Sequence, residues 1–386
     1  MSAGKKEYDW LIVGAGLYGA CVAYRLHREG KRCLVIDRRS HLGGNIYCEQ
    51  REGIQVHKYG AHIFHTSNSQ VWQFVNSLVP FNRYTNSPIA NYHGELYNLP
   101  FNMNTFRQIW GISTPAEAEK IIKEQRDQAQ QRFARMRPEA VADGTYHAQN
   151  LEEQALLLVG RDIYERLIKE YTEKQWGRPC RELPAFIIRR LPVRLTYDNN
   201  YFNDLYQGIP IGGYNKLISA LLDGVEARTE TDFFDDRNHW EGVADHIFFT
   251  GKIDQYYDYR FGQLEYRTVS FEEEMLDMPN YQGNAVMNFT SKEVPYTRII
   301  EHKHFEYFGQ DVYKLPRTVI SREYSTEWQH GMEPYYPVND ERNQSLYQQY
   351  RALSLQESSQ PDVTFGGRLA EYKYYDMAPI VERVLF

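Results

Sequence analysis

The 386-residue sequence lacks any apolar run that approaches the roughly 20 residues of a membrane-spanning helix, so we expect no membrane span. It also lacks a cluster of basic residues, and its net charge is −7. Because nucleic-acid binding depends on clustered Lys and Arg, we expect no nucleic acid as the main partner. No signal peptide precedes the first expected strand, which favours a cytoplasmic location.

Cysteine is scarce, and the spacing of the cysteines along the sequence does not indicate a disulfide framework or a metal centre. The four cysteines (Cys21, Cys33, Cys48 and Cys180) are scattered without CxxC spacing and are typical of reduced core residues. His62 and His65 lie three residues apart, but no carboxylate or third ligand is close in the sequence. We therefore expect no bound metal.

The N-terminal segment carries a dinucleotide-binding fingerprint. An apolar run at residues 10–13 predicts a strand, residues 20–29 predict a helix, and residues 32–36 predict a second strand. The turn between the first strand and the helix contains Gly14, Gly16, Leu17 and Gly19, and Asp37 ends the second strand. These glycines allow a tight turn, close approach of a pyrophosphate and close helix packing, while Asp37 can accept hydrogen bonds from a ribose.

Later segments favour FAD over NAD. Arg38 follows the ribose acid, and Gly43, Gly44 and Asn45 allow the chain to fold back over an extended cofactor. Two further segments are typical of FAD-binding domains: an apolar strand ends at Gly251, and a Gly-Gly turn precedes Arg368. Arg368 could pair with the pyrophosphate.

These patterns predict an α/β fold: a FAD-binding Rossmann-like domain with an inserted helical domain and an antiparallel sheet domain. We expect residues 1–80, 205–275 and 360–386 to form the discontinuous FAD-binding domain. Residues 100–195 are expected to form the helical insertion with a mobile substrate loop, and residues 81–99 and 276–345 the sheet domain.

Aromatic residues are abundant, at 15% with 31 tyrosines, and they gather with charged residues in several segments. Tyr171 and Trp176 lie five residues apart at a helix end, a spacing suited to sandwiching a planar base. Arg189, Arg190 and Arg194 surround a proline-containing break, so this loop could bring guanidinium groups to phosphate.

Taken together, six segments resemble the bacterial UDP-galactopyranose mutases over essentially the whole chain, in the family's order. They are YGAHIFHTSN, YTEKQW, RLPVRLTYDNNYF, VPYTRI, EPYYPVN and GGRLAEYKYYDM. The resemblance implies interconversion of UDP-galactopyranose and UDP-galactofuranose with FAD, which must be reduced although no net redox change occurs. It also implies a cytoplasmic homodimer that supplies cell wall biosynthesis.

The resemblance further implies roles for individual residues. Arg190 and Arg298 would contact the diphosphate, with Arg189 and Arg194 as alternatives to Arg190. His62 would lie close to the flavin ring, where it also counts among the catalytic residues. The implied nucleotide-binding residues are Tyr171, Thr172, Gln175, Trp176, Tyr201, Asn288, Tyr336 (with Tyr335 as its rival), Tyr374 and Asp376, and Leu17 and Met377 join the cofactor-binding residues.

The mechanism that follows is a hypothesis. Reduced flavin N5 attacks the anomeric carbon and expels UDP, the sugar ring opens through an iminium-type adduct, and another hydroxyl closes the smaller ring. Four alternatives remain open at this point: a flavin oxidoreductase of the amine-oxidase-like class, a nicotinamide-dependent sugar-nucleotide epimerase, a non-catalytic nucleotide-binding module, and a mutase that accepts UDP-N-acetylgalactose.

Overall fold

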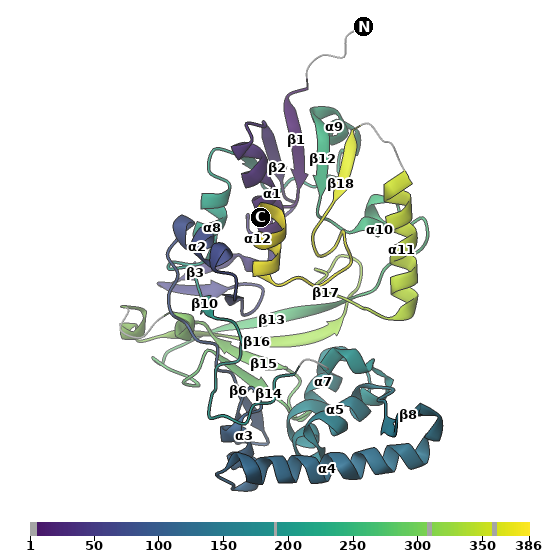
Figure 1. Cartoon of the computed structure of the whole chain (residues 1–386). Coiled ribbons are helices and arrows are strands. Elements are labelled where there is room, and N and C mark those ends of the chain that lie inside the picture. Colours follow the sequence, from purple (N-terminus) through teal and green to yellow (C-terminus); the bar gives the residue numbers. More distant parts are fainter. Residues whose placement is uncertain (1–5, 189–190, 307–310, 357–360) are drawn as a thin grey trace.

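The computed structural model describes residues 6–188, 191–306, 311–356 and 361–386, and their elements form three stacked parts (Figure 1). A five-stranded sheet with flanking helices lies at one end of the molecule. A seven-stranded sheet crosses the middle, and a group of helices lies at the other end. The N-terminal strand and the C-terminal helix belong to the same end part, so the chain leaves this part and returns to it.

The five-stranded sheet is parallel throughout and contains the predicted fingerprint. Its strand order is β11 (Glu226–Arg228), β2 (Cys33–Ile36), β1 (Tyr8–Val13), β12 (Ala244–Phe249) and β18 (Asp362–Phe365). The predicted strands at residues 10–13, 32–36 and 246–249 are therefore confirmed as neighbours. Parallel pairing requires crossover connections, and α1 (Leu17–Arg28) supplies the first of them.

Both faces of this sheet are covered. Helices α1, α8 (Tyr214–Leu221) and α12 (Met377–Leu385) pack on one face and share a core with Val71 and Val75 of α2 (Ser69–Leu78). On the other face, Phe233, Trp240, Phe249 and Tyr256 form an aromatic cluster that includes α9 (Arg237–Val243) and α10 (Ile253–Tyr256). Coverage of both faces explains why β2 is buried at all four of its positions.

The seven-stranded sheet is the expected sheet domain, and its strand pairs are antiparallel except one. Its order is β17 (Tyr336–Pro337), β13 (Tyr266–Leu276), β16 (Thr318–Glu327), β15 (Arg298–Glu301), β14 (Val286–Phe289), β6 (Ile89–Tyr92) and β7 (Glu95–Asn98). The exception is the parallel β14–β6 pair, whose strands come from separate segments of the chain. Strand β13 pairs with β16 from Arg267–Glu327 to Leu276–Thr318, so it belongs here although the expected boundary left residues up to 275 with the FAD-binding part.

The helical part has a core of its own. Its helices are α3 (Met103–Trp110), α4 (Pro115–Met136), α5 (Leu151–Val159), α6 (Arg161–Ile163) and α7 (Lys169–Trp176), with a π-helical turn at Tyr164–Ile168 between the last two. Thr114 caps α4 in a capping box with Glu117, as its sequence predicts. Asn150 caps α5, but the Glu153 carboxylate binds Tyr146, Gln149 and Arg137 instead of completing a box.

Shorter elements connect these parts. Three two-stranded ladders pair β3 (Cys48–Arg51) with β4 (Ile54–His57), β5 (Phe64–Thr66) with β10 (Tyr206–Gly208), and β8 (Val141–Ala142) with β9 (Thr145–Tyr146). The last long helix, α11 (Glu341–Gln356), packs against α10. The 3₁₀ turns are Gly44–Ile46, Pro138–Ala140, Cys180–Glu182, Ala185–Ile188, His302–Phe305 and Asp311–Lys314.

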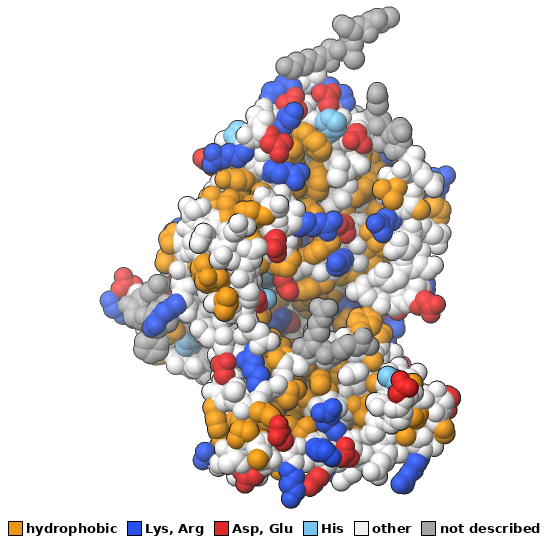
Figure 2. Space-filling view, in the orientation of Figure 1, with side chains coloured by type: hydrophobic (Ala, Val, Ile, Leu, Met, Phe, Trp, Pro, Cys, Tyr) orange, Lys and Arg blue, Asp and Glu red, His pale blue; other side chains and the backbone are white. Residues whose placement is uncertain are grey.

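The described residues bear on three expectations, which concern membrane spans, clustered charge and cysteines. None of their helices is both long enough and apolar enough to cross a bilayer. On the face drawn in Figure 2, basic and acidic side chains are interspersed, with no broad region of one sign. The four cysteines are buried free thiols.

Candidate active site

Two cavities meet at the junction of the three parts. One of about 430 Å³ lies at the carboxyl end of the parallel sheet, where ligands bind in such folds. The other, of about 440 Å³, lies between the seven-stranded sheet and the helical part. Both are lined by His62, Arg368, Tyr375 and Met377, so a ligand in either cavity would end against the same side chains.

The first cavity collects the predicted cofactor residues. They are Gly14, Gly16, Leu17, Gly19, Asp37, Arg38, Gly43, Gly44, Asn45, His62, Gly251, Arg368 and Met377, and every one lines it. These residues come from segments more than 300 positions apart in the chain, as expected for a cofactor domain assembled from distant pieces. We call this space the cofactor cavity.

The glycines of the fingerprint are required for different steric reasons. A Cβ on Gly14 would lie 2.0 Å from the Thr250 hydroxyl, and a Cβ on Gly19 would lie 2.0 Å from the Gly14 carbonyl oxygen. Gly16 differs, because its nearest neighbour would be the Gly44 Cα at 3.9 Å. No protein atom therefore requires glycine at position 16, whereas a phosphate approaching the N-terminus of α1 would require it.

Charged groups at the far end of this cavity are arranged around Glu333, which sequence reasoning did not single out. Its carboxylate pairs with Arg38 and Arg39 at 2.8 and 2.7 Å. One terminal nitrogen of Arg39 (Nη1) is buried without a hydrogen-bond partner among the described residues. Asp37 is engaged as well, because its carboxylate accepts hydrogen bonds from the Ala15 and Arg39 backbone N–H groups.

These features fit a flavin dinucleotide. The uncapped N-terminus of α1 offers N–H groups to a pyrophosphate, and the orphaned Arg39 nitrogen offers a donor to another polar group of the cofactor. The cavity reaches from these groups to His62, so a cofactor bound along it would extend to the second cavity.

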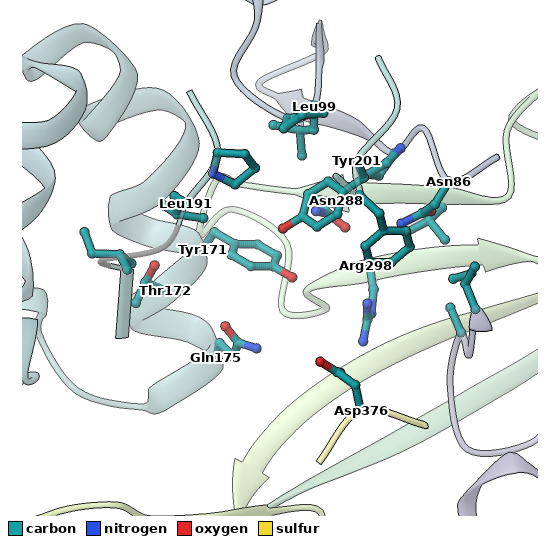
Figure 3. A pocket seen from close by; sticks show the side chains of 18 of the residues that line it. Asn86, Leu99, Tyr171, Thr172, Gln175, Leu191, Tyr201, Asn288, Arg298 and Asp376 are labelled. Carbon is teal, nitrogen blue, oxygen red and sulfur yellow. The ribbon is translucent and has the colours of Figure 1, made fainter. Parts of the chain in front are cut away.

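The second cavity collects most of the predicted nucleotide-binding residues, and we call it the substrate cavity. It is lined by His62, Tyr171, Thr172, Gln175, Tyr201, Asn288, Arg298, Tyr374 and Asp376. Figure 3 shows side chains from α7, from β14 and β15, and from the C-terminal segment converging on one space. The Asn288 side-chain oxygen is buried there without a hydrogen-bond partner among the described residues, as expected for a group that awaits a ligand.

Arg298 is a cation of the substrate cavity that a buried carboxylate holds in place. Its Nε donates to a Glu323 carboxylate oxygen at 2.7 Å, and the Glu323 side chain is 5% exposed. Burial alone would lower the pKa of Arg298, but the Glu323 carboxylate, together with Tyr171 and Tyr336, outweighs burial and raises the pKa above its usual value. The guanidinium therefore stays charged and fixed in position, ready to bind an anion.

Tyrosine hydroxyls surround this cation as neutral donors. Burial raises the pKa of Tyr171, Tyr201 and Tyr336, so these phenols remain protonated at neutral pH. Tyr336 contacts Arg298, and its ring lies 5.9 Å from that of Tyr374. Tyr335 is 4% exposed and faces Arg39 and Tyr59, so the structure brings Tyr336, rather than its rival, to the substrate cavity's cation.

Trp176 lies elsewhere than expected. It lines a third cavity with Arg178, Phe186 and Trp328, and it is absent from the lining of the substrate cavity. The helix geometry explains this placement, because five residues correspond to about 140° around the axis, so Tyr171 and Trp176 point from different sides of α7. The walls on the Tyr171 side are instead aliphatic: Leu99, Leu167, Ile168 and Leu191.

The arginine-rich loop is described only at its edges. Arg189 and Arg190 fall outside the described residues, so the expected role of Arg190 stays a prediction. Ile188 and Leu191 on either side of them line the substrate cavity. Arg194, the other alternative, donates to the Asn200 and Tyr201 carbonyls and to Asn203, and it does not line the cavity.

His62 stands where the two cavities meet. Burial lowers its pKa to about 4, and its Nδ1 lies 2.8 Å from the Gly60 carbonyl oxygen. Since a carbonyl only accepts, Nδ1 carries the proton and Nε2 keeps a free lone pair. His65, three residues on, pairs with Asp204 instead, and no group of metal-ligating side chains occurs among residues the structure describes.

Sequence reasoning missed three supporting groups: Glu323, Glu333 and Lys174. Glu323 pairs with Arg298, Glu333 pairs with Arg38, and Lys174 binds backbone carbonyls next to Asn288. Each partner is distant in the sequence, so only strand register or contact between parts of the fold brings the groups together. Glu323 carries no local signal, because it follows another charged residue, Arg322, and only the structure shows that it is buried.

Known proteins that are similar to this chain include nucleotide-sugar mutases and a nucleotide-binding domain family. A family profile described as UDP-galactopyranose mutase matches residues 166–374, and one described as an NAD(P)-binding Rossmann-like domain matches residues 12–78. A dTDP-fucopyranose mutase of Escherichia coli is 39% identical over 97% of this chain and 96% of its own length. A Klebsiella pneumoniae protein named "Probable UDP-galactopyranose mutase" is 38% identical over 97% and 92%.

Solved structures give the same relationship at the level of the fold. A reduced UDP-galactopyranose mutase superposes with a TM-score of 0.69 at 15% identity, covering 98% of this chain and 94% of that one. A putrescine oxidase variant superposes at 0.53 with 11% identity, covering 98% and 97%. The family profile spans more than half of the chain and the mutase relatives span nearly all of it, so this chain belongs to the UDP-galactopyranose mutase family.

Proposed function

We propose that this mutase interconverts UDP-galactopyranose and UDP-galactofuranose by ring contraction, using reduced FAD. Family membership makes the chain an isomerase and implies a flavin cofactor and a nucleotide-sugar substrate. The observation that carries the proposal is the meeting of a dinucleotide-sized cavity and an Arg298-lined cavity at His62. A flavin ring and the sugar of a bound nucleotide would face each other there.

The substrate cavity can hold a nucleoside diphosphate in one direction. Arg298 and Arg368 are cations near the shared end, and hydroxyls of Tyr201 and Tyr374 lie beside them. The aliphatic end around Tyr171 suits the base, with Gln175 and Asn288 as hydrogen-bonding groups. The sugar, attached to the outer phosphate, then lies against His62 and the cofactor cavity.

The fixed cations act on the bond that must break. When the anomeric carbon–oxygen bond breaks, negative charge grows on the departing diphosphate. Arg298, held by Glu323, already stands where that charge develops, and it needs no reorganisation. We propose that Arg190 adds a second cation from its loop, as the family resemblance implies.

The cofactor supplies the remaining chemistry. Reduced FAD would provide a nucleophilic ring nitrogen for the anomeric carbon and would be regenerated unchanged, which accounts for the absence of net redox change. Gly16, the N-terminus of α1, Arg39 and Met377 would hold it along the cofactor cavity. The neutral His62 would accept a hydrogen bond at Nε2 from a sugar hydroxyl or a flavin donor.

One assay tests this function. Purified holoenzyme is incubated with UDP-galactofuranose, with and without dithionite, and the nucleotide sugars are separated. We expect UDP-galactopyranose only after reduction, and strongly reduced turnover for Arg190→Ala and Arg298→Ala. Oxygen consumption with an amine substrate and no isomerisation would instead support an amine-oxidase-like enzyme.

A second substrate deserves the same assay, namely dTDP-fucopyranose. The relative that acts on it is 39% identical to this chain. The aliphatic walls formed by Leu99, Leu167 and Ile168 could also accept the additional methyl group of thymine, whose burial is favourable by roughly 0.8 kcal/mol. Competition between the UDP-, dTDP- and N-acetylated sugars, measured as kcat/KM ratios, identifies the preferred substrate.

We also propose a cytoplasmic homodimer, which rests on the family resemblance alone. Light scattering coupled to size-exclusion chromatography measures the assembly directly. A mass near that of one 45.6 kDa chain would contradict it.

A further inference from the structure

The ammonium group of Lys174 is enclosed by backbone carbonyls of another part of the molecule. Its Nζ lies 2.7 Å from the carbonyl oxygen of Phe289, 2.8 Å from that of Ser291, 3.2 Å from that of Val294 and 2.9 Å from that of Tyr296. Phe289 ends β14, and the other three belong to the connection between β14 and β15, whereas Lys174 lies on α7, more than 110 residues earlier in the sequence.

This arrangement is more than an ordinary lysine contact. An ammonium group has three hydrogens, so four carbonyl oxygens must share them, and their partial negative charges converge on one cation. Without that cation the carbonyls would repel one another in a partly buried place. Lys174 therefore holds the connection in a closed shape as well as attaching it to α7.

The two elements joined in this way carry the two ends of the substrate cavity. Tyr171 and Gln175 flank Lys174 on α7 and line the base end. Asn288 and Arg298 are at the end of β14 and the start of β15, on either side of the connection that Lys174 encloses. A displacement of α7 from this connection would separate Tyr171 and Gln175 from Asn288, the other group proposed to bind the base, and from Arg298, which is proposed to bind the phosphate.

Further contacts agree with a fixed α7. The Gln175 carbonyl accepts hydrogen bonds from Arg267 at 2.9 Å and from Ser325 at 2.6 Å. The Glu170 carboxylate accepts the Lys292 backbone N–H at 2.8 Å. Lys174 supplies the central link. Among the side chains described for α7, it alone contacts both the start of the connection, at Phe289, and its end, at Tyr296.

We propose that Lys174 is a positioning residue: it fixes α7 to the β14–β15 connection so that the base and the diphosphate of a nucleotide sugar are bound at the same time. This inference rests on the proposed function only for the class of ligand. Lys174 touches neither the substrate nor the cofactor, and its loss should weaken nucleotide binding while leaving flavin binding unchanged.

Protonation of Lys174 gives a readout that a merely structural role would not produce. Burial lowers the pKa of Lys174 to about 8, against an opposing effect of Glu170, the charged side chain that faces it. On the connection itself, Lys292 pairs with Glu170 and Glu293 pairs with His93. As pH rises through about 8 the ammonium loses its charge, so the four carbonyls lose their cation and UDP should bind more weakly.

The experiment measures the dissociation constant of UDP with oxidised holoenzyme, which requires no turnover. For Lys174→Met we expect the constant to rise about tenfold or more, the effect of losing roughly one charged hydrogen-bonding group. The flavin spectrum should be unchanged. Lys174→Arg, which keeps the charge, should restore part of the affinity, and Lys120→Met, which changes an exposed lysine of α4, should bind UDP normally.

The pH series completes the test. Between pH 7 and 9 the unmodified enzyme should lose affinity for UDP, whereas Lys174→Met should show a weak, nearly constant affinity. If Lys174→Met does not fold, the loss of affinity in the unmodified enzyme still tests the inference. Normal UDP binding by Lys174→Met would overturn this inference alone, and failure of the unmodified enzyme to bind UDP would overturn the proposed function with it.

Discussion

Glu323 holds Arg298 by one nitrogen, with its carboxylate oxygen 2.7 Å from Nε, and so leaves the terminal nitrogens of the guanidinium for other partners. The Thr297 hydroxyl contacts the same carboxylate at 3.3 Å, and the two strands that carry the pair are neighbours in the sheet. The cation of the substrate cavity is therefore positioned by backbone register before any ligand arrives.

Glu323→Gln should lower kcat/KM for the nucleotide sugar by roughly 10- to 100-fold, because it removes the charge that fixes Arg298 and leaves a buried cation without a partner. Steady-state kinetics with UDP-galactofuranose and dithionite measure this. Glu272→Gln is the matched control, since Glu272 pairs in the exposed part of the neighbouring strand. Unchanged kinetics for Glu323→Gln would mean that Arg298 is held by other contacts.

Gly16→Ala should fold normally but lose flavin affinity by about tenfold or more, equivalent to ~1.4 kcal/mol. The added Cβ meets no protein atom closer than 3.9 Å, so only a cofactor that approaches Gly16 would be displaced. The flavin content of purified protein, read from its visible absorbance, gives the result. Gly242→Ala, where nothing lies within 4 Å, is the control, and full flavin content in Gly16→Ala would contradict the expected phosphate position.

Trp176→Phe and Tyr171→Ala should differ in their affinity for UDP, although the sequence suggested that Tyr171 and Trp176 bind the base as a pair. Tyr171 lines the substrate cavity and Trp176 does not, so only Tyr171→Ala should weaken UDP binding. The expected loss is roughly 5- to 100-fold, corresponding to ~1–3 kcal/mol for one stacked base. Titration calorimetry with UDP distinguishes the variants. A comparable loss of UDP affinity in Trp176→Phe would mean that both aromatic rings bind the base, as the sequence suggested.

The free energy of unfolding should fall as pH decreases below about 6.5, because three histidines resist protonation in the folded state: the buried His57 and His302, and His62, whose pKa burial lowers to about 4. Burial lowers the pKa of His302 to about 3 and that of His57 well below its usual range. Only the unfolded chain then binds protons between pH 6.5 and 4, which favours unfolding. At pH 5.5 we expect a loss of roughly 1.4 kcal/mol for each histidine relative to pH 7.5.

Urea unfolding at the two pH values measures this loss. His302→Asn should be less stable at pH 7.5, because the hydrogen bond between the imidazole and Ser321 is altered, but its dependence on pH should be about two-thirds as steep, since His57 and His62 remain. An equal dependence on pH in the variant and the unmodified protein would assign the effect to other groups.

The cofactor half of the site was readable from the sequence because its signals are local. The Gly14–Gly19 turn, Asp37 and the Gly43–Gly44 pair each depend on backbone conformation within a few residues. The structure gives the same reasons, with Gly14 at φ +105° and Gly43 at φ +98°. The packing of α7 against the sheet was not readable, and it decides that Tyr171, rather than Trp176, lines the substrate cavity.

By itself, the sequence determined the strand–turn–helix of the cofactor cavity, the caps of α4 and α5, and the set of aromatic and cationic side chains available to bind a nucleotide. Hydrophobic periodicity and glycine conformation act over short stretches, so they are written into neighbouring residues. Only the tertiary structure decided that Glu323 fixes Arg298, that Lys174 joins α7 to the β14–β15 connection, and that Trp176 faces another cavity. Each of these depends on strand register or on packing between distant segments, and pairwise contacts of that kind are not encoded in any local pattern.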